Sequence, residues 1–211
     1  MAHSNLAVPE LTAIEIHGMT RSSFIMRGAL AAGAVYGAGA ITPFVRQAIA
    51  QGDGGDVDIL NFALTLEFLE EAFYKQAVKE VKLSKDVKPI AEQILDDESK
   101  HVDFLKEAIS GAGAEPTKAP KVDFGNAFKS EKSFLKLAQT FEDTGVSAYN
   151  GAAPQIQDKK ILGAAGTIVQ IEGRHAALIR FLRGEDITPS AFDKPLEMEE
   201  VLEAVKPFVK S

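Results

Sequence analysis

Two short stretches decide the fold: DDESKH (residues 96–101) and QIEGRH (residues 170–175). Each contains a Glu followed three residues later by a His, as the pairs Glu98–His101 and Glu172–His175, and no other histidine occurs after residue 50. Residues three apart share one face of a helix, so each pair can converge on one point. Because Glu occupies roughly one position in ten, two such coincidences have a probability of about one in a hundred. The pairs therefore indicate ligands.

The sequence around both pairs has the apolar pattern of helices. Four segments carry an apolar stripe with a spacing of three to four residues, and no strand-like alternation of useful length occurs. These segments are residues 56–81, 90–110, 134–149 and 159–183. The first and third connections are short, whereas a Pro/Gly/Ala-rich stretch at residues 111–125 separates the middle two. This order predicts an all-α protein of two antiparallel helical hairpins joined by a long crossover, with Gly184 as the last C-cap.

The two halves of this helical region match each other. The interval along the chain from Glu67 to Glu142 equals the interval from Tyr74 to Tyr149, the only tyrosines after residue 50. The two Glu-x-x-His pairs recur at almost the same interval. We infer a duplicated helical hairpin.

Four glutamates lie on the apolar stripes rather than on the solvated faces. Burying an unpaired carboxylate is costly, so such groups are normally paired or bound to a metal. One Glu from each helix and the two histidines give a ligand set around the bundle axis: Glu67, Glu98, His101, Glu142, Glu172 and His175. Four negative charges match two divalent cations, and mixed carboxylate and imidazole donors suit iron or manganese, with zinc as a further candidate.

The roles of the two tyrosines stay open. Tyr74 and Tyr149 each follow a candidate ligand Glu by seven residues, or two helical turns, so their hydroxyl groups can lie near the metals. Aromatic residues at helical spacing also commonly just pack in a core. The sequence supports a role beside the ligands and a packing role equally.

Other acidic residues are expected to be solvated. Asp97 and Asp143 adjoin candidate ligands, and a hydrogen bond to a ligand imidazole is the alternative to a solvated side chain. Glu70 and Glu71 are expected on the exposed face of their helix or at its border.

The composition excludes several classes of function. The chain has 211 residues, a net charge of −7 and a pI near 5.2, which argues against nucleic acid as a partner. Because it has no cysteine, disulfides, thiolate metal sites and Cys nucleophiles are excluded. The length suits one globular domain with an appendage.

Residues 1–50 have the features of an export leader. Arg21 and Arg27 precede an uncharged Ala/Gly-rich run at residues 28–45, and Ala48-Ile49-Ala50 forms an A-x-A site. The stretch TRSSFIM resembles a twin-arginine leader, although Ser22 stands where the second arginine belongs. A secretory leader is favoured over an uncleaved membrane anchor or a buried Ala-rich helix.

This leader defines the expected organisation of the chain. Residues 51–55 are a linker, residues 56–184 a four-helix bundle, and residues 185–211 a tail with a short helix. The mature protein is expected to be periplasmic, at the cell surface or secreted. Contact with a membrane is expected only through a retained leader, and a homo-oligomer stays open.

The order of ligands resembles that of a known family. A Glu, a Glu-x-x-His, a second Glu and a second Glu-x-x-His on successive helices are similar to the ferritin-like di-metal carboxylate proteins over residues 56–184. An Ala/Gly-rich leader ahead of NFALTLEFLEEAFY (residues 61–74) further resembles the exported ferritin-like domain proteins of bacteria. The resemblance implies a ferritin-like bundle.

The same resemblance implies roles for individual ligands. Glu67 and His101 would complete one metal, Glu142 and His175 would complete the other, and Glu98 and Glu172 would bridge the two. Tyr74 matches the tyrosine that follows the first ligand Glu in ferritins and bacterioferritins.

The resemblance leaves three kinds of function. The first is a di-iron centre that oxidises Fe(II) with oxygen or peroxide, in iron handling or protection from oxidative stress. The second is a manganese centre that dismutates peroxide as manganese catalases do, and the third is a structural or stress-protection protein, metal-stabilised or metal-free. No Met lies between residues 27 and 197, so a bacterioferritin-type haem has no ligand in the bundle. A hydrolase is disfavoured, because both histidines are committed to the Glu-x-x-His pairs.

Overall fold

The computed structural model describes residues 55–210, and the expected leader, residues 1–50, lies outside them. Within the described part the chain forms helices joined by loops, with one isolated β-bridge, and the predicted all-α fold class is confirmed. The α-helices are α3 (Asp56–Glu80), α4 (Lys88–Gly111), α5 (Glu131–Ala152), α6 (Lys159–Arg183) and α7 (Met198–Val205). Short 3₁₀ turns are η2 (Ala127–Lys129), η3 (Ala153–Gln155) and η4 (Lys206–Phe208). None of these described helices is long and apolar enough to cross a membrane.

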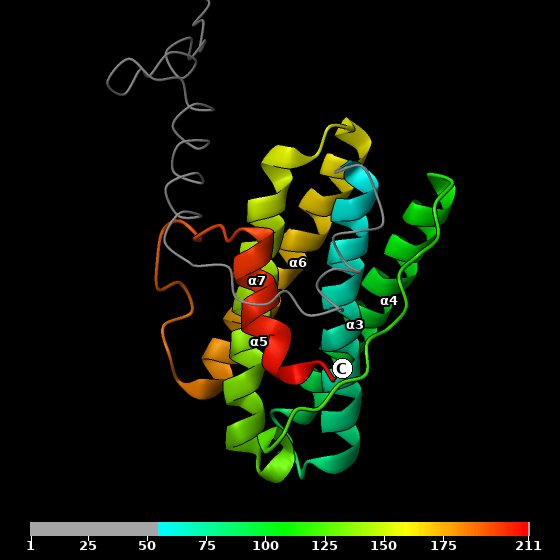
Figure 1. The fold of residues 1–211 in the computed structure, drawn as a ribbon. Coiled ribbons are helices and arrows are strands. Elements are labelled where there is room, and N and C mark those ends of the chain that lie inside the picture. Colours follow the sequence, from blue (N-terminus) through cyan, green and yellow to red (C-terminus); the bar gives the residue numbers. More distant parts are fainter. Residues whose placement is uncertain (1–54, 211) are drawn as a thin grey trace, which may run out of the picture. The chain divides into compact units, whose positions relative to one another are not determined.

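Helices α3 to α6 form a bundle of two antiparallel hairpins. Helix α3 pairs with α4, and α5 pairs with α6, through short turns (Figure 1). The connection from α4 to α5 runs along the length of the bundle, so that α5 begins at the end where α4 began (Figure 1). This is the predicted crossover, and α7 is the predicted short C-terminal helix.

Local sequence signals set where the last two bundle helices meet α3. The side chain of Asp158 caps α6 by accepting a hydrogen bond of 2.6 Å from the Lys160 amide, and Gly184 ends α6 in the left-handed conformation at φ 70°. The Asp56 carboxylate accepts hydrogen bonds from the amides of Gln157 and Asp158, at 2.8 and 2.7 Å. These contacts hold the start of α3 beside the turn between α5 and α6.

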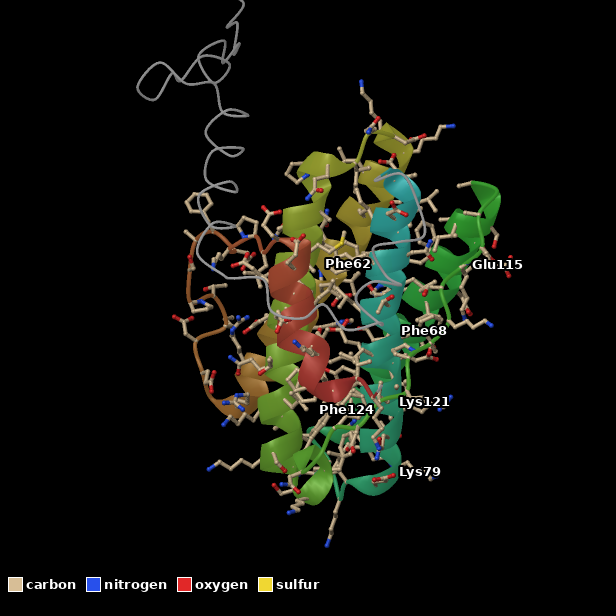
Figure 2. All side chains as sticks on the ribbon, in the orientation of Figure 1. Phe62, Phe68, Lys79, Glu115, Lys121 and Phe124 are labelled. Atoms are coloured by element: carbon tan, nitrogen blue, oxygen red, sulfur yellow. The ribbon has the colours of Figure 1, made fainter. Side chains whose placement is uncertain are left out.

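One end of the bundle is filled by a cluster of six phenylalanines, and we call it the aromatic end. At its centre the Phe73 ring lies 4.9–5.4 Å from four of the others, and two of these four pairs are edge-to-face. The six are Phe73, Phe124, Phe128, Phe134, Phe141 and Phe208. In Figure 2, Phe124 and Lys79 mark this end, and Glu115, Lys121 and Phe124 mark the course of the crossover toward it.

The C-terminal tail closes the aromatic end. Val201 and Val205 of α7 are buried in the same core. The β-bridge joins Val122 of the crossover to Val209, and the Lys210 amide donates a hydrogen bond of 2.9 Å to the Lys121 carbonyl. The tail and the crossover therefore hold each other against the helices.

The opposite end of the bundle is packed less fully, and we call it the cavity end. A cavity of about 330 Å³ opens there between α3, α4, α5 and α6. Its wall includes Ala63, Leu105, Tyr149 and Ile168, which belong to a separate and smaller core cluster. The six candidate ligands lie between the two ends.

Candidate metal centre

The six candidate ligands lie on the inner faces of four different helices. Helix α3 carries Glu67, α4 carries Glu98 and His101, α5 carries Glu142, and α6 carries Glu172 and His175. The four glutamates have an exposed fraction of 0%, and the two histidines are also buried. Their apolar neighbours in the sequence force these helix faces inward, and the carboxylates follow because they share those faces.

The six residues form two overlapping clusters. Glu67 and His101 join Glu98 and Glu172 in one cluster, and the ligand atoms all lie within 4.8 Å of one another. The second cluster satisfies the same limit and again contains Glu98 and Glu172, this time with Glu142 and His175. Two carboxylates therefore belong to both clusters, one from each Glu-x-x-His pair.

Each histidine turns one ring nitrogen toward three carboxylates. Nδ1 of His101 lies 3.3 Å from Glu67, 3.2 Å from Glu98 and 3.1 Å from Glu172. Nδ1 of His175 lies 2.9 Å from Glu98, 3.5 Å from Glu142 and 3.9 Å from Glu172. One imidazole N–H cannot serve three acceptors at once, so both arrangements are centred on a shared point rather than on a single hydrogen bond.

The unpaired atoms of the cluster test whether these residues fit metal ions. Among the described residues, buried ligand atoms without a hydrogen-bond partner are Glu67 Oε2, Glu98 Oε1, Glu142 Oε2, both carboxylate oxygens of Glu172, and His175 Nδ1. Buried polar atoms in a native protein are nearly always satisfied, so this concentration needs a partner. Carboxylate oxygens and imidazole nitrogens are donors that suit iron, manganese and zinc. The residues fit two divalent ions.

Without metal, the cluster balances its charge with protons. Burial alone would lower the pKa of His101, but the close carboxylates of Glu172, Glu67 and Glu98 raise it to about 12. The pKa of His175 rises to about 11 against the same effect of burial, through Glu142 and Glu98.

Two of the carboxyl groups are also pushed toward their neutral forms. Burial raises the pKa of Glu98 to about 7, although both histidines oppose this. Burial, followed by the charges of Glu98 and Glu67, raises the pKa of Glu172 well above its usual value. A metal ion bound here would therefore compete with protons for the same atoms.

The two tyrosines contact the ligands reciprocally across the bundle. Tyr74 of α3 donates a hydrogen bond to Glu142 of α5, and Tyr149 of α5 donates one of 2.5 Å to Glu67 of α3. Burial, and then the adjacent glutamate, raises the pKa of each phenol well above its usual value, so both remain donors. The spacing placed the hydroxyl groups near the ligands but did not indicate that each tyrosine reaches the other half.

The two aspartates beside ligands have different partners. Asp97 lies 3.3 Å from Nε2 of His175, the alternative to a solvated side chain, and this contact orients the imidazole. Asp143 instead pairs with Arg180. Solvation was therefore the wrong expectation for Asp97.

Glu70 corrects a further prediction. It is 3% exposed, whereas the sequence pattern favoured the exposed face or its border. Burial, and then the charges of the four ligand glutamates, raises its pKa well above the usual value. Glu71 does lie at the border, where Ser99 donates a hydrogen bond of 3.2 Å to it.

The internal repeat explains why Glu70 fits inside. Gly145 follows Glu70 at the same interval along the chain by which Glu142 follows Glu67. A Cβ at Gly145 would lie 3.4 Å from carboxylate oxygens of both Glu70 and Glu172. One half of the repeat thus supplies a carboxylate where the other half has no side chain. The presence of Gly145 at the position equivalent to Glu70 is the sequence feature that could have predicted the burial of Glu70.

Together the fold and the cluster define a four-helix bundle with a candidate metal centre of six residues. A model of the ferritin-like domain family matches residues 55–185, more than half of the chain. The chain therefore belongs to the ferritin-like domain family, as the order of its ligands predicted. A search of curated proteins found no match.

Proposed function

We propose that this protein holds two divalent metal ions, iron in preference, and uses them to reduce oxygen or peroxide while oxidising Fe(II). The observation that carries the proposal is the pair of overlapping clusters that share Glu98 and Glu172. Shared carboxylates would place two ions side by side, and such a pair supplies two electrons to a single O–O bond when bound.

The chain's own residues would hold and shield this centre. Glu67 and His101 would complete one ion, and Glu142 and His175 would complete the other. The tyrosine hydroxyls fix the outer oxygens of Glu142 and Glu67, which leaves the inner oxygens free for metal. Burial excludes bulk water and so limits loss of reactive oxygen species from the site.

Manganese is the second candidate, because the same oxygen and imidazole donors suit it. A manganese-loaded centre would dismutate peroxide and would not need Fe(II) as a reductant. The iron reaction therefore consumes Fe(II) together with the oxidant, whereas the manganese reaction consumes peroxide alone.

Consumption of oxidant by separately loaded samples tests this proposal. With Fe(II), we expect two Fe(II) oxidised for each peroxide reduced to water, with His175→Ala reducing the rate at least tenfold. Glu71→Gln is the matched control, because Glu71 lies on α3 outside both clusters. Fe(II) oxidation at the same rate in His175→Ala and wild type would overturn the proposal, and turnover of peroxide by the manganese sample alone would replace iron with manganese.

We also propose that the protein is exported. Support comes only from the sequence of residues 21–50, with its arginines, apolar run and A-x-A site. Protein sequencing of the mature chain after cell fractionation is the test. A mature N-terminus near residue 51 is expected, and an intact leader in the cytoplasmic fraction would contradict export.

A further inference from the structure

The cavity at the cavity end reaches the layer of side chains next to the candidate metal centre. Three of its lining residues each lie four residues, or about one helical turn, from a ligand. Ala63 precedes Glu67, Leu105 follows His101, and Ile168 precedes Glu172. A fourth lining residue, Tyr149, donates its hydroxyl hydrogen bond to Glu67. The inner end of the cavity is therefore one side-chain layer from the ligands.

The chemistry of the wall selects an apolar occupant. Charge is confined to Asp158 and Lys160 among the lining residues, and both are exposed at the start of α6. Phe104, which is 43% exposed, lines the same cavity. The remaining wall is aliphatic or aromatic, with the Tyr149 hydroxyl already bonded to Glu67. An occupant would meet polar groups only at the solvent side.

The cavity is large enough to hold a molecule much bigger than dioxygen. Its volume of about 330 Å³ lies within the range of ligand pockets, roughly 300–1,000 Å³. An apolar cavity of about 150 Å³ already holds a benzene molecule. The wall on α6 extends from Lys160 to Ile168, about 12 Å along the helix axis. An extended chain of about ten carbons, with bonds of about 1.5 Å, has that length.

We propose that this cavity binds a single alkyl chain of about ten carbons, with its polar head near Lys160 and its far end beside Tyr149. Binding does not require that the metal centre turn over. A role for the bound chain as a substrate rests on the proposed function, because the inner end of the cavity lies beside the candidate metal ligands.

Calorimetric titration of the purified full chain with sodium decanoate, sodium octanoate and 1-decanol tests the proposal. We expect saturable binding of one decanoate, with octanoate weaker by about 15-fold, since each buried methylene contributes about fourfold. Similar affinity for 1-decanol would show that the chain is recognised more than the carboxylate. Absence of saturable binding of all three compounds, or equal affinity for decanoate and octanoate, would overturn the proposal.

Two neighbouring substitutions on α6 locate the bound chain. Ala164 lines the cavity, whereas a side chain at Gly163 meets open space. We expect Ala164→Phe to weaken decanoate binding at least tenfold and Gly163→Phe to leave it unchanged. Equal losses in both variants would contradict the assigned position. The dependence on chain length, measured on the wild type, keeps the test valid if Ala164→Phe fails to fold.

Metal content measured on the same samples separates this proposal from the proposed function. Decanoate binding without metal would support the cavity and count against the metal centre. Two metal ions per chain without decanoate binding would support the metal centre and count against the cavity proposal.

Discussion

The aromatic end and the cavity end are built from the same repeated hairpin, yet one is closed and the other open. The interval that relates Tyr74 to Tyr149 also relates Phe73, at the centre of the aromatic end, to Ala148, which lines the cavity. The two tyrosines keep the same contact with a ligand glutamate at both ends. The two halves of the repeat therefore match at the centre, and differences in side-chain size make its two sides unequal.

Segments outside the repeat increase this difference. The crossover supplies Phe124 and Phe128 to the aromatic end, and the tail supplies Phe208. The cavity end receives no aromatic residue from the described tail. The cavity end therefore keeps open space next to the layer of candidate ligands.

The largest expected effect comes from breaking the aromatic end. Phe73→Ala removes a side chain with 0% exposure, so we expect the free energy of unfolding to fall by about 3–5 kcal/mol. Phe104→Ala at the cavity end, where the ring is 43% exposed, should cost less than about 1 kcal/mol. Urea denaturation of both variants measures the difference. Equal losses would mean that the two ends are packed alike.

The second prediction concerns the centre between the two ends in metal-free protein. The pKa of Glu98 rises from 4.5 to about 7 on folding. The stability that this group adds to the folded state is therefore complete below pH 4.5 and is lost as the pH rises through 7. The raised pKa values of His101 and His175 cause a further loss of folding stability above pH 6.5. Burial would raise the pKa of Glu67, but the neighbouring His101 and Glu98 lower it, and the stability that Glu67 adds to the folded state is complete above pH 4.5.

Stability of the metal-free protein should therefore decrease from pH 4.5 upward, by about 1.4 kcal/mol per pH unit for each proton that only the folded state holds. Added metal should stabilise the protein more at higher pH, because it replaces those protons. Thermal melts with and without chelator across this range test both signs. A metal-free stability that rises with pH would show that the cluster is not protonated as described.

The third prediction is that replacing a small side chain by a larger one lowers stability little only where the structure has space beside it. Ala63 and Ala138 occupy equivalent positions in the two halves of the repeat, but Ala138 is fully buried and Ala63 lines the cavity. We expect Ala138→Leu to cost about 1–3 kcal/mol through overpacking, and Ala63→Leu to cost less than about 1 kcal/mol. Denaturation curves compare the two directly, and the opposite order would refute the cavity as open space.

The smallest expected effect is at the tyrosines. Tyr74→Phe removes a buried hydrogen bond to Glu142 and should cost about 1 kcal/mol. Tyr149→Phe removes the equivalent buried hydrogen bond to Glu67 and should cost about the same. Denaturation of the metal-loaded protein measures both variants, and no loss in either would show that the tyrosine hydroxyls do not stabilise the two carboxylates.

The sequence predicted the fold because its helix patterns are long and its connections distinct. The segment expected at residues 159–183 coincides with α6, and the six candidate ligands come together because they share the inward faces of their helices. Glu70 was misplaced because its burial depends on the missing side chain of Gly145 on another helix. The cavity depends in the same way on the sizes of side chains that face each other from four helices. The apolar period of a helix predicts which face is buried, but not how completely the facing side chains fill the space.

The metal content of protein purified from its native host tests the central claim most directly, when wild type is compared with His101→Ala and Glu172→Ala. We expect about two ions per chain in the wild type, about one in His101→Ala, and none in Glu172→Ala, because Glu172 belongs to both clusters. Circular dichroism of each variant confirms that the helices remain. A folded wild type without metal, or a Glu172→Ala variant that keeps two ions, would contradict the assignment of this cluster as a two-metal centre.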